Sequence, residues 1–253
     1  MRYHIYLLVI ISLFSPLRAQ SENLRLTSLE WAPYVSSKLP SRGMTAAIVQ
    51  TAAEAAGLKL EISYFPWSRA VQQGLTAPQY AGYFPAFYLK ERERNCYFSK
   101  PLGNSIIGFA HVKPFDWAVL ADLKKYRLGL VHEYANGEEF DRWVKQGWLN
   151  VDSAPSDLSN LRKLLAGRVD VIVIDQYVFK QLLQTARVEL PGLPATIQFH
   201  ARALTKFSMH VCFQKNARGL ALRERFDQAL QKLDIKKLEA LYFQSLAVQE
   251  SSP

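Results

Sequence analysis

The chain has 253 residues, of which 49% are hydrophobic, and its 31 Lys and Arg outnumber its 22 Asp and Glu to give a formal net charge of +9. This length and composition suffice for two compact lobes of roughly 100 residues each. The basic residues are scattered and form no stripe with interleaved aromatic residues, which argues against a nucleic-acid partner. The excess charge indicates solubility and a mild attraction to anions.

The N-terminus has the residue order of a secretory signal. Met1 and Arg2 precede an apolar run over 5–13, and a short polar segment leads to Ala19. The apolar run is shorter than the roughly 20 residues that span a bilayer. We expect a signal peptide over 1–19, cleavage after about Ala19 and a periplasmic mature protein; an uncleaved anchor is the alternative.

The first part of the mature chain alternates short apolar runs with helical stretches, which is typical of a mostly parallel α/β sheet. The pattern predicts strands over 23–29, 58–64, 80–84 and 96–99, and helices over 43–56 and 67–74. A β-rich run without a helix follows over 104–112 and separates this set from the next.

A second alternating set follows. Asn136, with Glu139 three residues on, indicates a capped helix that ends before Gly147, and Ser156 opens a helix that ends at Gly167. The remaining predicted elements are a strand over 126–131, a buried strand over 169–174, a helix over 176–185, β segments over 198–205 and 207–213, and a helical pair over 220–243.

Four short stretches together resemble the family 3 periplasmic solute-binding proteins, which include histidine- and glutamine-binding proteins. These stretches are Glu30-Trp31-Ala32-Pro33-Tyr34, Glu91-Arg92 with Tyr97-Phe98-Ser99-Lys100-Pro101, Leu165-Ala166-Gly167-Arg168-Val169-Asp170 running on to Asp175, and Ile235-Lys236-Lys237-Leu238. Their order and spacing carry the resemblance over the whole mature chain.

The resemblance implies an α/β, two-lobed periplasmic-binding-protein fold of type II, with the lobes joined by two β hinge segments. The first lobe would be discontinuous, over 20–104 and 206–253, and the second would be the inserted 105–205. The hinges would lie near 103–107 and 204–208.

Two charged residues match the family's ligand-binding positions. The resemblance implies that Arg92 clamps a ligand carboxylate, for which a planar guanidinium offers two parallel donors. It implies that Asp175, after a buried strand, accepts a ligand ammonium group from the opposite lobe. A zwitterion between them would favour the closed state. A solvated arginine and a helix N-cap are the alternatives, and capping does not exclude binding.

Aromatic residues complete the expected site. Trp31, Tyr34 and Trp67 follow first-lobe strands. They could stack on a ligand in the binding site, and the alternative is that they pack in the hydrophobic core. The expected ligand-binding set also includes Tyr88, His132 and Tyr134. The segment 132–137 could receive an anion at a helix start. The chain departs from the family at 85–88 and 132–134, where bulky residues replace small ones, so a bulkier, aromatic or modified ligand fits about as well.

The two cysteines are far apart in sequence, and either a disulfide or two buried thiols fit an exported protein. The resemblance places the strand of Cys212 beside that of Cys96, which favours the bridge. No zinc-binding histidine pair, nucleophile elbow or phosphate loop is present, so we expect no metal, no cofactor and no enzyme activity.

We therefore expect a monomer that captures a small polar, amino-acid-like ligand by hinge closure for an ABC-type importer. Its partners would be that ligand and an inner-membrane permease or sensor protein. One alternative is a cyclohexadienyl dehydratase-like enzyme on the same fold, in which His132 and Glu133 are the acid and base candidates. Another is a ligand-sensing subunit for a signalling receptor.

Overall fold

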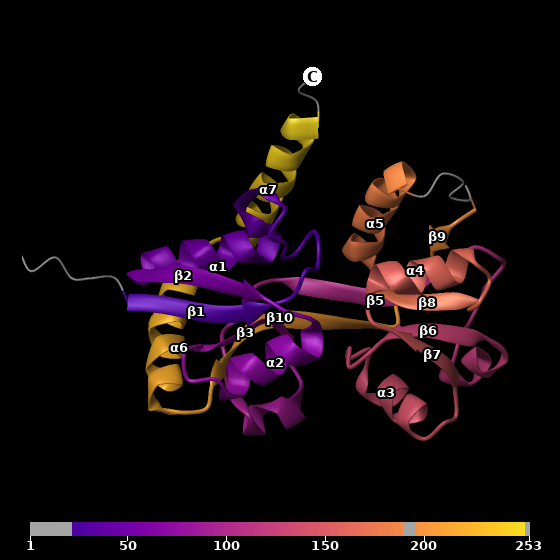
Figure 1. The fold of residues 1–253 in the computed structure, drawn as a ribbon, viewed down its shortest axis with the longest axis horizontal. Coiled ribbons are helices and arrows are strands. Elements are labelled where there is room, and N and C mark those ends of the chain that lie inside the picture. Colours follow the sequence, from indigo (N-terminus) through magenta and orange to yellow (C-terminus); the bar gives the residue numbers. More distant parts are fainter. Residues whose placement is uncertain (1–21, 190–195, 251–253) are drawn as a thin grey trace, which may run out of the picture.

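The computed structural model describes residues 22–189 and 196–250 and forms two lobes side by side (Figure 1). The expected signal peptide lies outside these residues. One path of paired strands runs through both lobes in the order β2-β1-β3-β10-β5-β8-β6-β7, with β4 beside β10 and β9 beside β5. The mixed α/β architecture predicted from the alternating pattern is confirmed.

The first lobe is built on parallel strands covered by helices. Its strands are β1 (Glu22–Ser28), β2 (Leu58–Tyr64), β3 (Gly82–Phe87) and β4 (Cys96–Phe98), and its helices are α1 (Met44–Ala55), α2 (Trp67–Thr76), α6 (Ala217–Leu230) and α7 (Ile235–Glu250). Short 3-10 helices lie at Pro40–Arg42 and Lys90–Arg94. Helices α6 and α7 come from the end of the chain and pack on α1, so distant segments share one core.

The second lobe repeats this plan with the middle of the chain. Its strands are β5 (Asn104–His111), β6 (Arg127–Val131), β7 (Asn150–Ala154), β8 (Val171–Asp175) and β9 (Gln198–Phe199), and its helices are α3 (Glu138–Lys145), α4 (Asp157–Leu165) and α5 (Gln176–Glu189), with a 3-10 helix at Leu120–Lys125. Strand β8 is buried along its whole length, as its apolar run predicts.

Two strands connect the lobes. The first half of β10 (Thr205–Gln214) pairs with the start of β5, from Thr205 opposite Ile107 to Ser208 opposite Asn104. The second half of β10 pairs with β3 and β4 of the first lobe. The lobes are therefore joined through extended chain, without an intervening helix.

Of the two helix caps predicted from the sequence, one is confirmed and one is wrong. The Ser156 hydroxyl accepts the Ser159 N–H, so Ser156 caps α4 as expected. The predicted Asn136 cap is wrong, because α3 begins one residue later and Asp141 accepts the N–H groups of both Asn136 and Gly137. The carboxylate of Asp141, which lies within α3, accepts these N–H groups in place of an N-cap side chain.

Some elements differ from their predicted extent. Strand β7 (Asn150–Ala154) was not predicted, because its polar residues give no apolar run. It forms because β6 supplies a parallel partner from Arg127 to Val131. Strand β9 covers two residues of the predicted 198–205.

The disulfide is confirmed between Cys96 on β4 and Cys212 on β10. The two strands are antiparallel neighbours, and the Cα atoms of the cysteines are 5.5 Å apart. Both cysteines are buried beneath α2 with Tyr83 and Ala86. The bridge fixes the returning strand β10 to the first lobe, across 116 residues of sequence.

Candidate functional site

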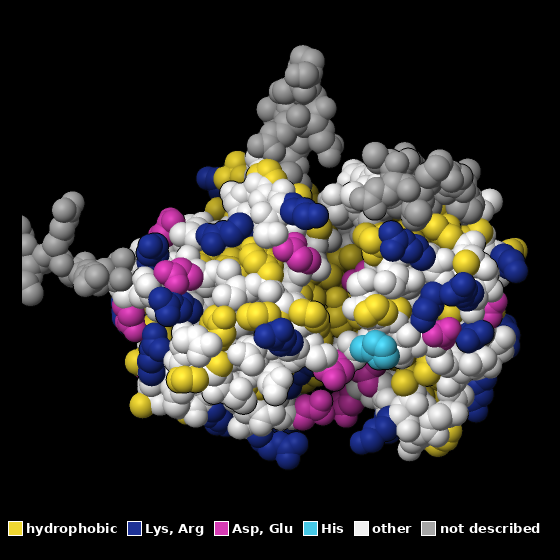
Figure 2. All heavy atoms as spheres, viewed as in Figure 1, with side chains coloured by type: hydrophobic (Ala, Val, Ile, Leu, Met, Phe, Trp, Pro, Cys, Tyr) yellow, Lys and Arg dark blue, Asp and Glu magenta, His cyan; other side chains and the backbone are white. Residues whose placement is uncertain are grey.

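A narrow pocket, partly open to solvent, lies between the lobes, and we call it the interlobe pocket. Its walls are mostly aromatic and aliphatic, and the lining residues are Leu29, Trp31, Trp67, Pro85, Phe87, Arg92, Tyr134 and Ala135. Figure 2 shows hydrophobic side chains gathered in the hollow between the lobes, with acidic side chains near its lower end.

The aromatic wall forms because the ends of β1 and β3 and the start of α2 meet one loop of the second lobe. The ring of Tyr134 meets Trp31 and Trp67 edge-on, with centroids 6.5 and 6.4 Å away. Trp31 also meets Phe87 at 6.0 Å and stacks on Tyr34 at 4.5 Å. Among the predicted aromatic residues, Trp31, Trp67 and Tyr134 therefore come together around the pocket.

Arg92 lies on this wall, in the 3-10 helix that follows β3. Its side chain is half-buried, and its guanidinium donates one long hydrogen bond, 3.3 Å, to the carbonyl of Phe87. Within 22–189 and 196–250 it forms no ion pair. A planar cation with spare donors on an apolar wall can receive a carboxylate.

Asp175 occupies a different place from Arg92. Its carboxyl group is 3% exposed, does not line the interlobe pocket and accepts five hydrogen bonds from the protein. The donors are the Tyr34 hydroxyl at 3.0 Å, the Ser105 hydroxyl, and the backbone N–H groups of Ile106, Tyr177 and Val178. The last two bonds confirm that Asp175 caps α5.

The bond from Tyr34 to Asp175 joins the two lobes, and we call this contact the latch. Burial raises the pKa of Tyr34, and the adjacent negative charge of Asp175 raises it further, so the hydroxyl stays a donor. Burial also raises the pKa of Asp175, while its hydrogen-bond donors lower it. The latch is thus a direct hydrogen bond between buried side chains of the two lobes.

A second buried acid, Asp157, lies behind the aromatic wall. It is 8% exposed and accepts a 3.4 Å hydrogen bond from the Tyr134 hydroxyl. Burial, and then the charge of Asp175, raise the pKa of Asp157 to about 7, although Tyr134 and the Trp31 indole lower it. The Trp31 N–H makes no hydrogen bond of ordinary geometry.

Asp157 was missed by the sequence analysis. It directly follows the cap Ser156, where an acid simply favours a helix start, and no local signal indicates that the opposite lobe buries it. Phe87 and Pro85 were noted only as departures from the family pattern, yet both line the interlobe pocket.

Two predicted site residues lie elsewhere. Tyr88 is 41% exposed, packs on Phe98 and donates to Glu93. His132 is exposed and lines two outer grooves instead of the interlobe pocket. Glu133, the paired acid/base candidate, is also exposed and lines one of these grooves. The N–H groups of Asn136 and Gly137 that could receive an anion are bonded to Asp141.

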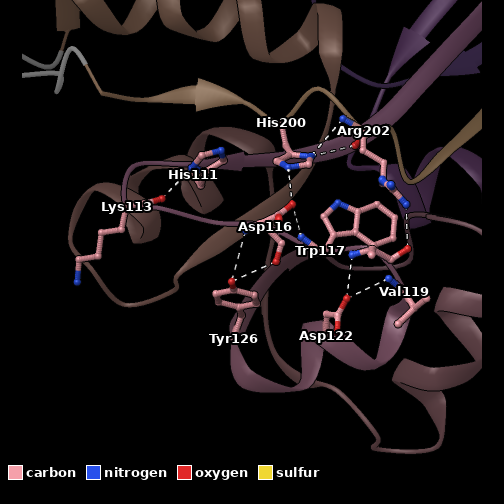
Figure 3. Close-up of polar contacts among 10 residues, drawn as sticks. His111, Lys113, Asp116, Trp117, Val119, Asp122, Tyr126, His200 and Arg202 are labelled. Atoms are coloured by element: carbon pink, nitrogen blue, oxygen red, sulfur yellow. Dashed lines mark hydrogen bonds and ion pairs between the residues drawn. The ribbon is translucent and has the colours of Figure 1, made fainter.

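Figure 3 shows a polar cluster at another part of the second lobe. His200 lies 3.5 Å from the Asp116 carboxylate, and its ring packs near that of His111, with centroids 6.1 Å apart. Arg202 donates to the carbonyl of Ala118. These contacts tie the segment after β9 to the segment after β5 and contribute no residue to the interlobe pocket.

Neither a cluster of metal-ligating side chains nor a membrane-spanning helix is found among the described residues. There, no group of three or more His, Cys, Asp or Glu side chains is arranged to hold a metal ion. Among the same residues, no helix has the length and apolar character needed to cross a membrane.

Neither a protein-family model nor a curated protein matches this chain. Solved structures do. An ancestral arginine-binding protein bound to arginine superposes with a TM-score of 0.72 at 17% identity, covering 88% of this chain and 97% of that one. A histidine kinase sensor domain with similarity to periplasmic binding proteins gives 0.73 at 16% identity, covering 89% and 96%.

The chain has the type II periplasmic-binding-protein fold. A third similar structure with this fold is an ancestral amino-acid-binding protein described as a precursor of cyclohexadienyl dehydratase, with a TM-score of 0.67 at 13% identity over 88% of this chain and 94% of that one. In this fold the interlobe pocket lies where the carboxyl ends of the parallel strands of both lobes face each other.

Proposed function

We propose that the protein is a periplasmic solute-binding protein that captures a small, amino-acid-like carboxylate between its lobes. The single observation that carries the proposal is the unpaired Arg92 guanidinium on the wall of the interlobe pocket. A ligand carboxylate would supply the two acceptors that the protein does not provide. Solved proteins of this fold that bind arginine or glutamate support a ligand of this size.

Closure is proposed to occur by rotation about 103–107 and 204–208, with the lobes divided as 20–104 plus 206–253 and 105–205. The paired starts of β5 and β10 lie in these segments. A ligand that contacts Arg92 and Trp31 on one lobe and Tyr134 on the other has higher affinity for the closed form, which shifts the population towards it.

The role of Asp175 as an acceptor for a ligand ammonium stays a prediction. Both oxygens of the Asp175 carboxylate are already bonded to protein donors. An ammonium would have to replace the Tyr34 hydroxyl, which would exchange one interlobe contact for another.

The test is a thermal-shift screen of the protein against amino acids, amines and small carboxylates, followed by titration of each hit. Arg92→Ala should weaken binding of a carboxylate by roughly 10- to 100-fold, because a charge-assisted hydrogen bond is lost. The matched control is Arg94→Ala, two residues away on the same 3-10 helix and exposed, which should retain affinity. Equal affinity of both variants, or no hit among the carboxylates, would overturn the proposal.

Delivery to an ABC-type permease is proposed as the role of the closed form, and a sensing role is the second candidate because a sensor domain has the same fold. Crosslinking of the ligand-bound protein to an inner-membrane permease would support transport. Crosslinking to a sensor ectodomain instead would support sensing.

A dehydratase on this fold is the third candidate, because one similar structure is described as a dehydratase precursor. The proposed acid and base, His132 and Glu133, lie outside the interlobe pocket, which favours binding without turnover. Incubation with prephenate or arogenate should leave both unchanged, and product formation would overturn the binding-only proposal.

A further inference from the structure

The lining of the interlobe pocket carries a positive charge and no negative charge. Arg92 is the only charged side chain among its lining residues. Glu91, Glu133 and Asp141 line an adjoining outer groove, which shares Arg92, Tyr134 and Ala135 with the interlobe pocket. Asp141 also accepts the N–H groups of Asn136 and Gly137. The pocket therefore offers an anion a partner and offers a cation no carboxylate.

Asp157 and Asp175, two buried acids of the second lobe, also lie outside the pocket lining. Asp175 already accepts five protein hydrogen bonds, and Asp157 is covered by Tyr134, whose hydroxyl bonds to it. With a pKa raised to about 7, Asp157 is also only partly ionised near neutral pH. A ligand ammonium in the pocket would lose its hydration without gaining an acceptor side chain.

The walls suit a flat apolar body. Trp31 packs in T-shaped contacts with Phe87 and Tyr134, and all three rings line the pocket. Trp67 faces the same tyrosine, and Leu29 and Pro85 fill the remaining sides without side-chain hydrogen-bond groups. Aromatic rings prefer offset-stacked and edge-to-face contacts, so a single ring gains more here than an aliphatic chain of equal size.

An ammonium could also be attracted by the faces of these aromatic rings. In this pocket, however, the same ammonium would lie beside the positive charge of Arg92, and like charges in a water-poor site repel. The attraction and the repulsion oppose each other, whereas a carboxylate on an uncharged ring meets only favourable partners.

We infer that the interlobe pocket selects a carboxylic acid with a flat aromatic body and does not recognise an ammonium group on it. This inference rests on the proposed function and narrows its ligand class from amino acids to aryl-alkyl carboxylates. It follows from the placement of one unpaired arginine among Trp31, Trp67, Phe87 and Tyr134.

The test is calorimetric titration of the protein with 3-phenylpropanoate and L-phenylalanine, which differ only in the α-ammonium group. We expect 3-phenylpropanoate to bind at least ten-fold more tightly. Tighter binding of L-phenylalanine would overturn the inference and leave the proposed function standing. Binding of neither compound, with an aliphatic amino acid bound through Arg92, would do the same. No binding of any carboxylate would overturn the proposed function itself.

The aromatic part of the inference has its own control. 3-Cyclohexylpropanoate has the same carboxylate and a saturated ring, and it should bind about three-fold more weakly or worse than 3-phenylpropanoate. Trp67→Leu keeps an apolar side chain at this partly buried position and should reduce that difference between the two acids, since the rings of Trp31, Phe87 and Tyr134 remain. Equal affinities of both acids for the unmodified protein would overturn the selection for an aromatic body.

Discussion

The two ends of the interlobe contact handle a charged side chain in opposite ways. At the latch, Asp175 is 3% exposed and accepts hydrogen bonds from five protein donors, one of them from the other lobe. At the interlobe pocket, Arg92 is half-buried and donates one long bond to a carbonyl. The Asp175 carboxylate is fully hydrogen-bonded within the protein, whereas the Arg92 guanidinium has donors available for a ligand.

From this difference we expect Asp175 to stabilise the fold and Arg92 to contribute to ligand binding. A buried acid that is fully bonded costs stability when it is removed, because its donors lose their acceptor. Removal of an arginine with spare donors changes the free energy of unfolding little, but it weakens the binding of a ligand that accepts hydrogen bonds from that arginine. Separate measurements of stability and of ligand binding distinguish the two roles.

The largest expected effect is at the latch. Asp175→Ala should lower the free energy of unfolding by about 3 kcal/mol, because it leaves buried donors from β5, α5 and Tyr34 without an acceptor. Urea denaturation followed by circular dichroism measures this. Asp175→Asn keeps an acceptor for the α5 cap and should lose less than half as much. A loss below about 1 kcal/mol for the alanine variant would contradict the latch.

The next effect concerns Asp157, which lies between the two ends. Its pKa is raised to about 7 in the folded protein, so the folded state holds this proton more tightly than the unfolded chain. Its contribution to stability is therefore complete below about pH 4 and falls as pH rises towards 7. Between pH 5 and 7 the fall is about 2 kcal/mol.

The matched control is Asp157→Asn, which cannot titrate. The difference in unfolding free energy between this variant and the unmodified protein should change with pH in that window and be constant above about pH 8. Comparing the two proteins cancels acids with raised pKa values that do not act on Asp157, such as Asp141 and Asp227. A difference that does not vary with pH would show that Asp157 ionises as an ordinary aspartate.

The smallest effect is expected at the pocket end. Arg92→Ala, measured without ligand, should change the free energy of unfolding by no more than about 0.5 kcal/mol, because one 3.3 Å bond to a carbonyl is lost. Differential scanning calorimetry of the ligand-free proteins tests this. A loss of 2 kcal/mol or more would mean that Arg92 is structural, and the contrast between the two ends would disappear.

Several features of the fold were predictable because they are local. The apolar run over 169–174 indicates a buried strand, and Ser156 carries its capping oxygen into the helix that it opens. The placement of Cys212 beside Cys96 came from the resemblance and was confirmed by the paired strands. Strand β7 was not predictable, because its polar residues form a strand only when β6 is there to pair with them.

The candidate site divides in the same way. The sequence places Trp31 and Trp67 after predicted strands, and the family resemblance singles out Arg92 as a candidate for binding a carboxylate. The three-dimensional structure was needed to show that Arg92 lines the interlobe pocket with no ion pair among the described residues, that Asp175 accepts five hydrogen bonds, and that Asp157 is buried. Burial and hydrogen bonding of these side chains depend on atoms from the opposite lobe, which are distant in the chain. Tyr34, for example, donates its hydrogen bond to Asp175 across 141 residues of sequence.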